Sequence, residues 1–208
     1  MRSKFSLFWV GLVLIFSELA LSSNKVGNGG NVVQCMNAGK VSLRLLDFYE
    51  AEVDPTADGK TAFEIAQIVL KKMSSVAPKL SNQYLKRLSK IESEIDFKND
   101  IQLLEVPDSK HLFKPLAKDC DVVQIAVRKK LVTASEKMFL IRKDLWQQLQ
   151  PSHQAGLLTH EIIYEHLSKL GEENSIKARR INAFLYAKKS KMNEFWNLIK
   201  ELEIPIYR

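Results

Sequence analysis

Cysteine is scarce: only Cys35 and Cys120 occur among the 208 residues. Two cysteines allow at most one disulfide within the chain. In an oxidising compartment we expect that disulfide, Cys35–Cys120, to form. It would close a loop of about 85 residues, for which the chain-entropy model gives on the order of 4 kcal/mol of stabilisation. The alternatives are two separate buried thiols or a nucleophilic cysteine, but the sequence places no base beside either residue.

Long apolar runs are also scarce. One lies at residues 5–16, and no second one follows. About a dozen residues are too few for a membrane span, which needs ~20. The run follows a basic start at residues 1–4 and precedes Ala20 and Ser22, which are small residues at the −3 and −1 positions of a cleavage site after Ser22. This pattern predicts a cleavable signal peptide over residues 1–22, with an uncleaved N-terminal anchor as the alternative. We therefore expect a secreted or periplasmic chain, not membrane-spanning once mature, with one domain over residues 23–208.

A phosphate-binding loop is absent as well. The glycine-rich stretch at 25–31, KVGNGGN, is not closed by Gly-Lys-Ser/Thr, and neither a preceding strand nor a following helix frames it. The glycines therefore indicate a turn or a flexible arm.

The charge balance is basic, with a formal net charge of +7 and a pI of about 9.3. A basic surface attracts anions. Secretion argues against nucleic acid as a partner, so we expect no nucleic-acid partner. The partner that this charge favours is an anionic envelope component, such as a cell-wall polymer or lipid head groups.

The pattern of apolar residues predicts a mixture of strands and helices. Short apolar runs bounded by polar turns predict strands at 31–35, 41–48, 101–106, 122–128 and 137–142. Helical spacing predicts helices at 62–76, 81–94, 144–150, from 152 to about 170, from 175, and at 193–201. Thr61 and Glu64 form a capping-box pattern, and Gly39 suits a hairpin turn. We expect an α+β fold in which a small, mainly antiparallel sheet packs against helical hairpins.

A small acidic patch follows the second predicted strand, at Asp47, Tyr49, Glu50 and Glu52. Hard cations need several oxygens that converge from a defined loop, and no such loop pattern is present. We interpret the patch as a solvated edge.

The one group of residues that suggests a chemical function is His160-Glu161, in the predicted helix after Ser152. On a helical wheel His160 lies near the centre of the most apolar arc, with Tyr164 one turn on. A histidine that points into a core needs partners for its ring nitrogens. Three roles meet that need: a structural hydrogen bond, for example with Tyr164 or a backbone carbonyl; a metal; or metal-free acid–base catalysis with Glu161.

The metal role has an incomplete pattern. His-Glu on a helix resembles the zinc-protease motif HExxH, in which two histidines bind zinc and the glutamate is the base. Here Tyr164 stands where the second histidine would be, and the sequence identifies no third ligand. Zinc is the cofactor to consider, with His160 as its ligand, and no other cofactor is predicted.

Two arginines on the next predicted helix offer Glu161 a partner. On the wheel Arg180 falls inside the apolar arc and Arg179 outside it. A short turn at 170–171 would make the two helices antiparallel neighbours. Pairing of Glu161 with Arg180 or Arg179 would satisfy both charges as a structural feature.

Several of these motifs together resemble a known group. GNGGN followed by VVQC, then LRLLDFYEAE, DLWQQL, and LLTHEIIYEHL with NSIKARRINAFL, are similar to an uncharacterised family of secreted bacterial proteins with a GNGG…C N-terminus and a C-terminal HExxY helix. The resemblance spans most of the predicted mature chain. It implies secretion, a single domain and the importance of residues 160–180, and it brings no known activity.

Two functions follow from this sequence. The first is a non-enzymatic binding or scaffolding domain of the cell envelope. The second is a metal-dependent hydrolase with a degenerate zincin-like helix, in which His160 and Glu161 are the catalytic residues and Tyr164, Arg179 and Arg180 support them.

Overall fold

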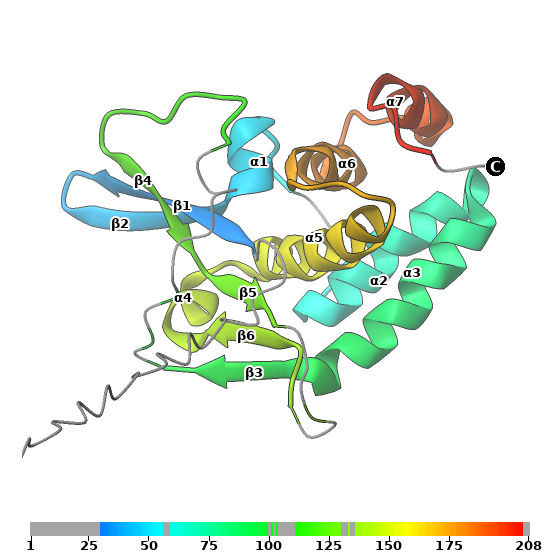
Figure 1. The fold of residues 1–208 in the computed structure, drawn as a ribbon. Coiled ribbons are helices and arrows are strands. Elements are labelled where there is room, and N and C mark those ends of the chain that lie inside the picture. Colours follow the sequence, from blue (N-terminus) through cyan, green and yellow to red (C-terminus); the bar gives the residue numbers. More distant parts are fainter. Residues whose placement is uncertain are drawn as a thin grey trace, which may run out of the picture.

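A computed structural model describes residues 30–55, 59–99, 101, 103, 111–129, 133 and 136–205. Two three-stranded sheets lie beside a group of helices (Figure 1), and the predicted α+β class is confirmed. The predicted signal peptide lies outside the described residues. No helix in the described part of the chain is long and apolar enough to cross a membrane.

The first sheet has the order β2-β1-β4 and is antiparallel throughout. Its strands are β1 (Asn31–Asn37), β2 (Lys40–Leu45) and β4 (Cys120–Gln124). Ala38 and Gly39, between β1 and β2, have φ of 48° and 76°, as a tight two-residue hairpin requires. Cys35 lies opposite Cys120 in the β1–β4 register, and the predicted disulfide joins them.

The second sheet has the order β3-β6-β5. Its strands are β3 (Ile95–Lys98), β5 (Ala126–Arg128) and β6 (Phe139–Arg142), with β3 parallel and β5 antiparallel to β6. The predicted strand at 122–128 is thus two strands, which meet at Ile125 and belong to different sheets. Of the predicted strand at 101–106, Ile101 and Leu103 lie outside any strand, and the other residues of that range are not described.

The structure contains two helical hairpins, as predicted. The first joins α2 (Ala62–Lys72) to α3 (Pro78–Ile91). The predicted capping box at the start of α2 is confirmed, because Thr61 Oγ1 accepts from the Glu64 amide at 3.2 Å and Glu64 Oε2 accepts from the Thr61 amide at 3.0 Å. Pro78 occupies the first turn of α3, where its missing N–H costs no hydrogen bond.

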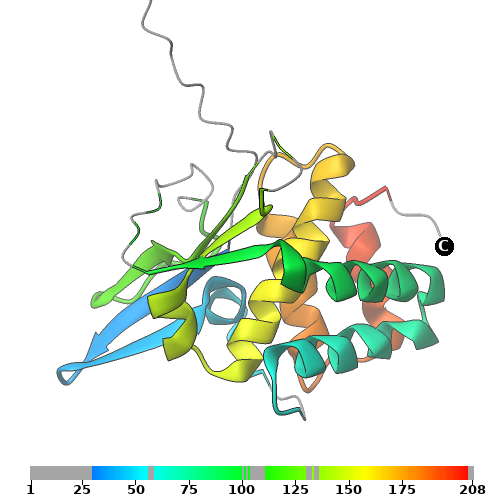
Figure 2. The ribbon, with the colours of Figure 1, turned by 90° about the horizontal axis from the view of Figure 1, so that it is seen from below.

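The second hairpin joins α5 (Pro151–Lys169) to α6 (Ile176–Tyr186) through the predicted turn, where Gly171 has φ of +96°. Helix α5 runs through the middle of the molecule and contacts α2, α3 and α6 (Figures 1 and 2). It is buried on nearly every face, unlike a surface helix with one apolar stripe. Two shorter helices are α4 (Lys143–Gln148) and α7 (Phe195–Glu201).

A short helix, α1 (Leu46–Glu50), replaces the end of the predicted strand at 41–48. Strand β2 stops at Leu45, and the helical spacing then turns Asp47 and Glu50 to the same side. Both acids are buried, at 0% and 5% exposure. The interpretation of the acidic patch as a solvated edge is therefore wrong for these two residues.

Helix α1 packs on α5 at Gly156. A Cβ built on Gly156 would lie 2.6 Å from Phe48 Cε2 and 2.8 Å from Leu45 Cδ2. The Phe48 ring cannot swing away, since it packs against Tyr186 at 5.0 Å between ring centroids. We expect Gly156→Ala to lower the free energy of unfolding by about 1–2 kcal/mol, because overpacking outweighs the helix preference of alanine. Urea unfolding measures it.

The exposed Asn82→Ala on α3 serves as the control for Gly156→Ala, with an expected effect within about 0.5 kcal/mol. If Gly156→Ala were as stable as the wild type, α1 would not approach α5 as closely as the structure has it.

Candidate functional site

The predicted His160–Glu161 pair lies inside a group of buried polar side chains, which we call the polar centre. Three helices supply its members two by two, and all are at most 5% exposed. The members are Asp47 and Glu50 from α1, His160 and Glu161 from α5, and Arg179 and Asn182 from α6. The polar centre thus joins α1 to both helices of the second hairpin.

Asp47 is the acceptor at its middle. Its Oδ2 accepts from His160 Nδ1 at 2.8 Å and from Asn182 Nδ2 at 2.6 Å. Asn182 Nδ2 also donates to the Gly156 carbonyl at 2.9 Å, which ties α6 to α5. An ionised carboxylate only accepts, so Nδ1 of His160 carries a proton.

Burial and charge oppose each other in this pair. Burial would lower the pKa of His160, but the Asp47 carboxylate outweighs it and leaves that pKa above its ordinary value. Burial would raise the pKa of Asp47, but the His160 charge and the two hydrogen bonds outweigh burial and leave that pKa below its ordinary value. Both shifts favour the charged pair, as expected for oppositely charged groups in contact.

Glu161 has a different partner from the one predicted. Its Oε1 accepts from the Gly30 amide at 2.7 Å. The Gly30 carbonyl in turn accepts from the amides of Ile125 and Ala126, at 3.1 and 3.2 Å, where β4 gives way to β5. Burial raises the pKa of Glu161, although His160 and the Gly30 amide lower it. Glu161 therefore anchors the residue that leads into β1.

The burial of the two arginines is the reverse of the prediction. Arg179, predicted outside the apolar arc, is 1% exposed and forms an ion pair with Glu50 at 2.9 Å. Arg180, predicted inside it, is partly exposed and pairs with Glu201 at 2.6 Å. The predicted pairing of Glu161 with either arginine is absent from the contacts of the described residues. The wheel failed because α1 packs against α6 and provides a buried acid on the side that looked polar.

The Glu50–Arg179 pair also holds the segment after residue 110. The amide of Phe113 donates to Glu50 Oε1 at 3.0 Å, and Arg179 donates to the His111 carbonyl. The Arg179 guanidinium lies 5.6 Å from the centroid of the Phe113 ring, within the cation–π range. Burial raises the pKa of Glu50 to about 7, against the lowering effects of Arg179 and the Phe113 amide.

Tyr164, predicted to support His160, lies beside it through a ring contact. The two rings are 6.2 Å apart, and the Tyr164 hydroxyl donates to the Glu173 carbonyl at 3.4 Å, in the turn between α5 and α6. Tyr164 is one helical turn from His160, but its hydroxyl bonds to the turn between α5 and α6.

Some buried atoms of the polar centre have no hydrogen-bond partner, and most of them are acceptors. They are His160 Nε2, Glu161 Oε2, Asp47 Oδ1 and Asn182 Oδ1, with atoms of the Glu50–Arg179 pair. Three metal-binding side chains do not come together anywhere in the described ranges. His160 and Glu161 alone would give zinc two ligands, fewer than the three protein ligands of a catalytic site.

His153, one heptad before His160 on α5, has a structural role. Its Nδ1 accepts from the Leu45 amide at 3.0 Å, so the ring must be neutral on that atom. Burial, helped by Arg44, lowers the pKa of His153 from 6.5 to about 4. A depressed pKa on a base means that the unfolded chain takes up the proton first as pH falls. Its stabilisation is therefore complete above pH 6.5 and is lost towards pH 4.

We expect the wild type to lose about 3 kcal/mol relative to His153→Gln between pH 7 and pH 4. The difference between the two proteins isolates this group, because Glu50 and the other acids titrate in both. Urea unfolding at four pH values measures it. Parallel pH profiles for the two proteins would show that His153 is not held neutral.

A second candidate site, the α3–α5 cleft, lies on another side of α5. Its charged and titratable lining includes Lys86, Arg87, Lys90, Glu165, His166 and Lys169, and its volume is about 190 Å³. Sequence reasoning missed it, because nothing in the sequence places α5 beside the cations of α3.

Comparison with known proteins gives no further guide: no protein-family model matches the chain, no curated protein is significantly similar to it, and no solved structure matches it significantly.

Proposed function

We propose that the protein is a secreted or periplasmic, non-enzymatic domain that binds or scaffolds in the cell envelope. One observation carries the non-enzymatic part: His160 and Glu161 are 1% and 2% exposed, and both are engaged by the chain itself. His160 is held by Asp47, and Glu161 by the Gly30 amide. A catalytic acid or base has to reach a reacting atom within hydrogen-bond distance. These two groups instead connect elements of the fold.

The position of the polar centre supports a structural role. It links the start of β1, α1, α5 and α6, which are far apart along the chain. Packing of apolar residues alone tolerates shifts between such elements, whereas a hydrogen bond fixes their relative position. In this proposal the polar centre sets the register of α1 on the second hairpin.

The surface supports a binding role. A binding domain for an anionic envelope component needs a basic patch, and the α3–α5 cleft supplies one. The Cys35–Cys120 disulfide agrees with an oxidising compartment.

Metal analysis and thermal unfolding of His160→Ala test the proposal. We expect the purified chain to lack stoichiometric zinc, and His160→Ala to melt at a lower temperature, because Asp47 loses its partner while buried. The exposed Lys98→Ala controls for handling and should melt like the wild type. Stoichiometric zinc that is lost in a fully folded His160→Ala would contradict the proposal.

A metal-dependent hydrolase remains the second candidate, on one observation. His160 Nε2 and Glu161 Oε2 are buried without a hydrogen-bond partner, and each is an atom that a ligand or water could engage. Glu161→Gln separates the two functions: it should abolish hydrolysis with little loss of stability if Glu161 is a base. The proposed domain has no hydrolysis to lose.

A further inference from the structure

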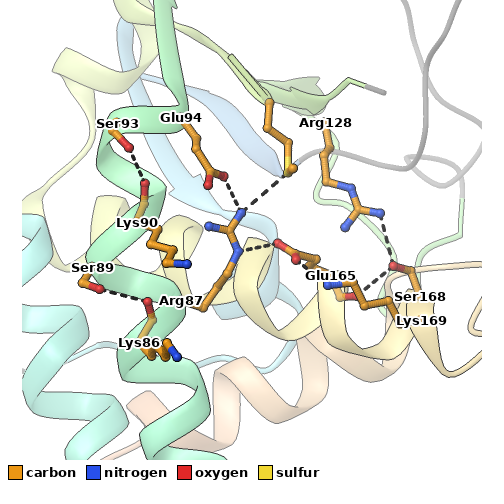
Figure 3. A network of polar contacts seen from close by, with 11 residues as sticks. Lys86, Arg87, Ser89, Lys90, Ser93, Glu94, Arg128, Glu165, Ser168 and Lys169 are labelled. Carbon is orange, nitrogen blue, oxygen red and sulfur yellow. Dashed lines mark hydrogen bonds and ion pairs between the residues drawn. The ribbon is translucent and has the colours of Figure 1, made fainter. Parts of the chain in front are cut away.

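The α3–α5 cleft is built from one stripe of each helix. On α3 the lining side chains are Gln83, Lys86, Arg87 and Lys90, with Tyr84 beside them, and on α5 they are Ile162, Glu165, His166 and Lys169. Apart from Tyr84, both sets follow the spacing i, i+3, i+4, i+7, which places four side chains on one helix face. The two faces are opposed across the cleft, with Arg87 reaching from α3 to Glu165 on α5 (Figure 3).

The single lining carboxylate is already neutralised. Glu165 accepts from Arg87 Nε through Oε2 at 2.7 Å and from Lys169 Nζ through Oε1 at 2.7 Å. Arg87 is further held by Glu94 at 2.6 Å, so two edges of its guanidinium are occupied (Figure 3). These contacts hold the pKa of Glu165 below its ordinary value, although burial alone would raise it. The ion pairs thus fix the position of the Glu165 side chain in the lining of the cleft, and Glu165 adds little uncompensated negative charge.

Two ammonium groups remain uncompensated. Lys86 and Lys90 are exposed and form no ion pair with the described residues. They are four residues apart on α3, and like charges at that spacing repel each other on a helix. An anion between the two helices would relieve that repulsion.

A neutral donor adds to the charges. The Tyr84 hydroxyl lies 2.9 Å from His166 Nδ1, and burial lowers the pKa of His166, so the ring is neutral near pH 7. When Tyr84 donates to Nδ1, the proton of the ring is on Nε2, which can then donate. Tyr84 keeps its proton for this purpose, because burial raises its pKa.

We propose that the α3–α5 cleft binds a phosphate group carried by an envelope polymer or a lipid head group, which makes this inference rest on the proposed binding function. The free ammonium groups of Lys86 and Lys90 are separate point charges, whereas the arginine fork that matches a planar carboxylate is occupied by Glu165 and Glu94. A phosphate offers oxygens in several directions to such donors. A cavity of about 190 Å³ accepts one such group and is smaller than the ~300 Å³ at which pockets for whole organic ligands begin.

The test compares two double variants of the mature chain. Lys86→Gln with Lys90→Gln removes the uncompensated charges, and Lys71→Gln with Lys72→Gln removes two exposed charges from α2 and serves as the matched control. Binding is measured by titration with inorganic phosphate, with a soluble polyglycerol phosphate, and with vesicles of phosphatidylglycerol or of phosphatidylcholine. Polyglutamate provides a carboxylate polymer of similar charge density.

We expect the cleft variant to bind the phosphate-bearing probe about tenfold more weakly, and the control variant to stay within about twofold of the wild type. Preference for the soluble polymer or for phosphatidylglycerol identifies the source of the phosphate. Equal losses in both variants, equal binding of polyglutamate, or no binding of any phosphate probe would overturn the site. Zinc-dependent hydrolysis that requires Glu161 would instead overturn the proposed function. In a hydrolysis assay the cleft variant and the control variant would then be equally active.

Discussion

Replacing Arg179 by methionine is expected to lower the free energy of unfolding by about 3–5 kcal/mol. Arg179 is 1% exposed, and its ion pair with Glu50 at 2.9 Å lies fully inside the protein. Methionine fills a similar length but leaves Glu50 buried without its counter-charge, and it also removes the bond to the His111 carbonyl. Urea unfolding at pH 8, where Glu50 with its pKa of about 7 is ionised in the wild type, measures the loss.

Arg180→Met is the matched control, since it makes the same change one residue along α6. Arg180 pairs with Glu201 at 2.6 Å, but the two side chains are 39% and 62% exposed. Exposed ion pairs contribute about 0–1 kcal/mol, so we expect a loss below about 1 kcal/mol. Equal losses in the two variants would mean that Arg179 is not the buried partner.

Asp47→Ala is expected to cost a similar amount, about 3–5 kcal/mol. Asp47 is the acceptor for both His160 and Asn182, and all three residues are at most 1% exposed. Without the carboxylate, His160 Nδ1 loses its partner, and Asn182 Nδ2 keeps only the Gly156 carbonyl. The charged form of His160 also loses the group that favours it. Asp54→Ala is the control, because the Asp54 side chain is 95% exposed and its pair with Arg44 is at the surface.

The pH dependence of that loss follows from the two shifts. The pKa of Asp47 is lowered by His160, so its stabilisation is present above about pH 3.8 and is lost as pH falls further. The pKa of His160 is raised by Asp47, so its stabilisation is complete below pH 6.5 and is lost as pH rises through the folded value. The difference between wild type and Asp47→Ala should therefore be largest between about pH 4 and pH 6.5. A difference that grows steadily above pH 8 would contradict the charged pair.

Much of the fold could be predicted, because the signals were local. The capping box at Thr61, the turn at Gly39 and the turn at Gly171 each depend on a few adjacent residues. The Cys35–Cys120 disulfide needed only a count of cysteines and an assumed compartment. His160 was correctly placed on an inward face, because the apolar arc of α5 follows from spacing alone.

The partners of His160 could not be predicted, because they are distant in sequence. Asp47 is 113 residues away from it, and the sequence LLDFYEAE predicted an extended strand with a solvated acidic end. One signal was available: Asp47 and Glu50 are three residues apart among apolar residues, which is the spacing of one helix face. Arg179 and Arg180 were exchanged for the same reason, since only the position of α1 decides which of them is buried.

A double-mutant cycle between Asp47 and His160, followed by urea unfolding at pH 6, addresses the structural role of the polar centre. The cycle uses Asp47→Ala, His160→Ala and the double variant. A polar centre that holds α1 on α5 predicts that each single change destabilises the chain and that the coupling energy is about 2 kcal/mol or more. If His160→Ala were as stable as the wild type and the coupling were near zero, the imidazole would not be holding the fold together, and a catalytic use of His160 would become the better explanation.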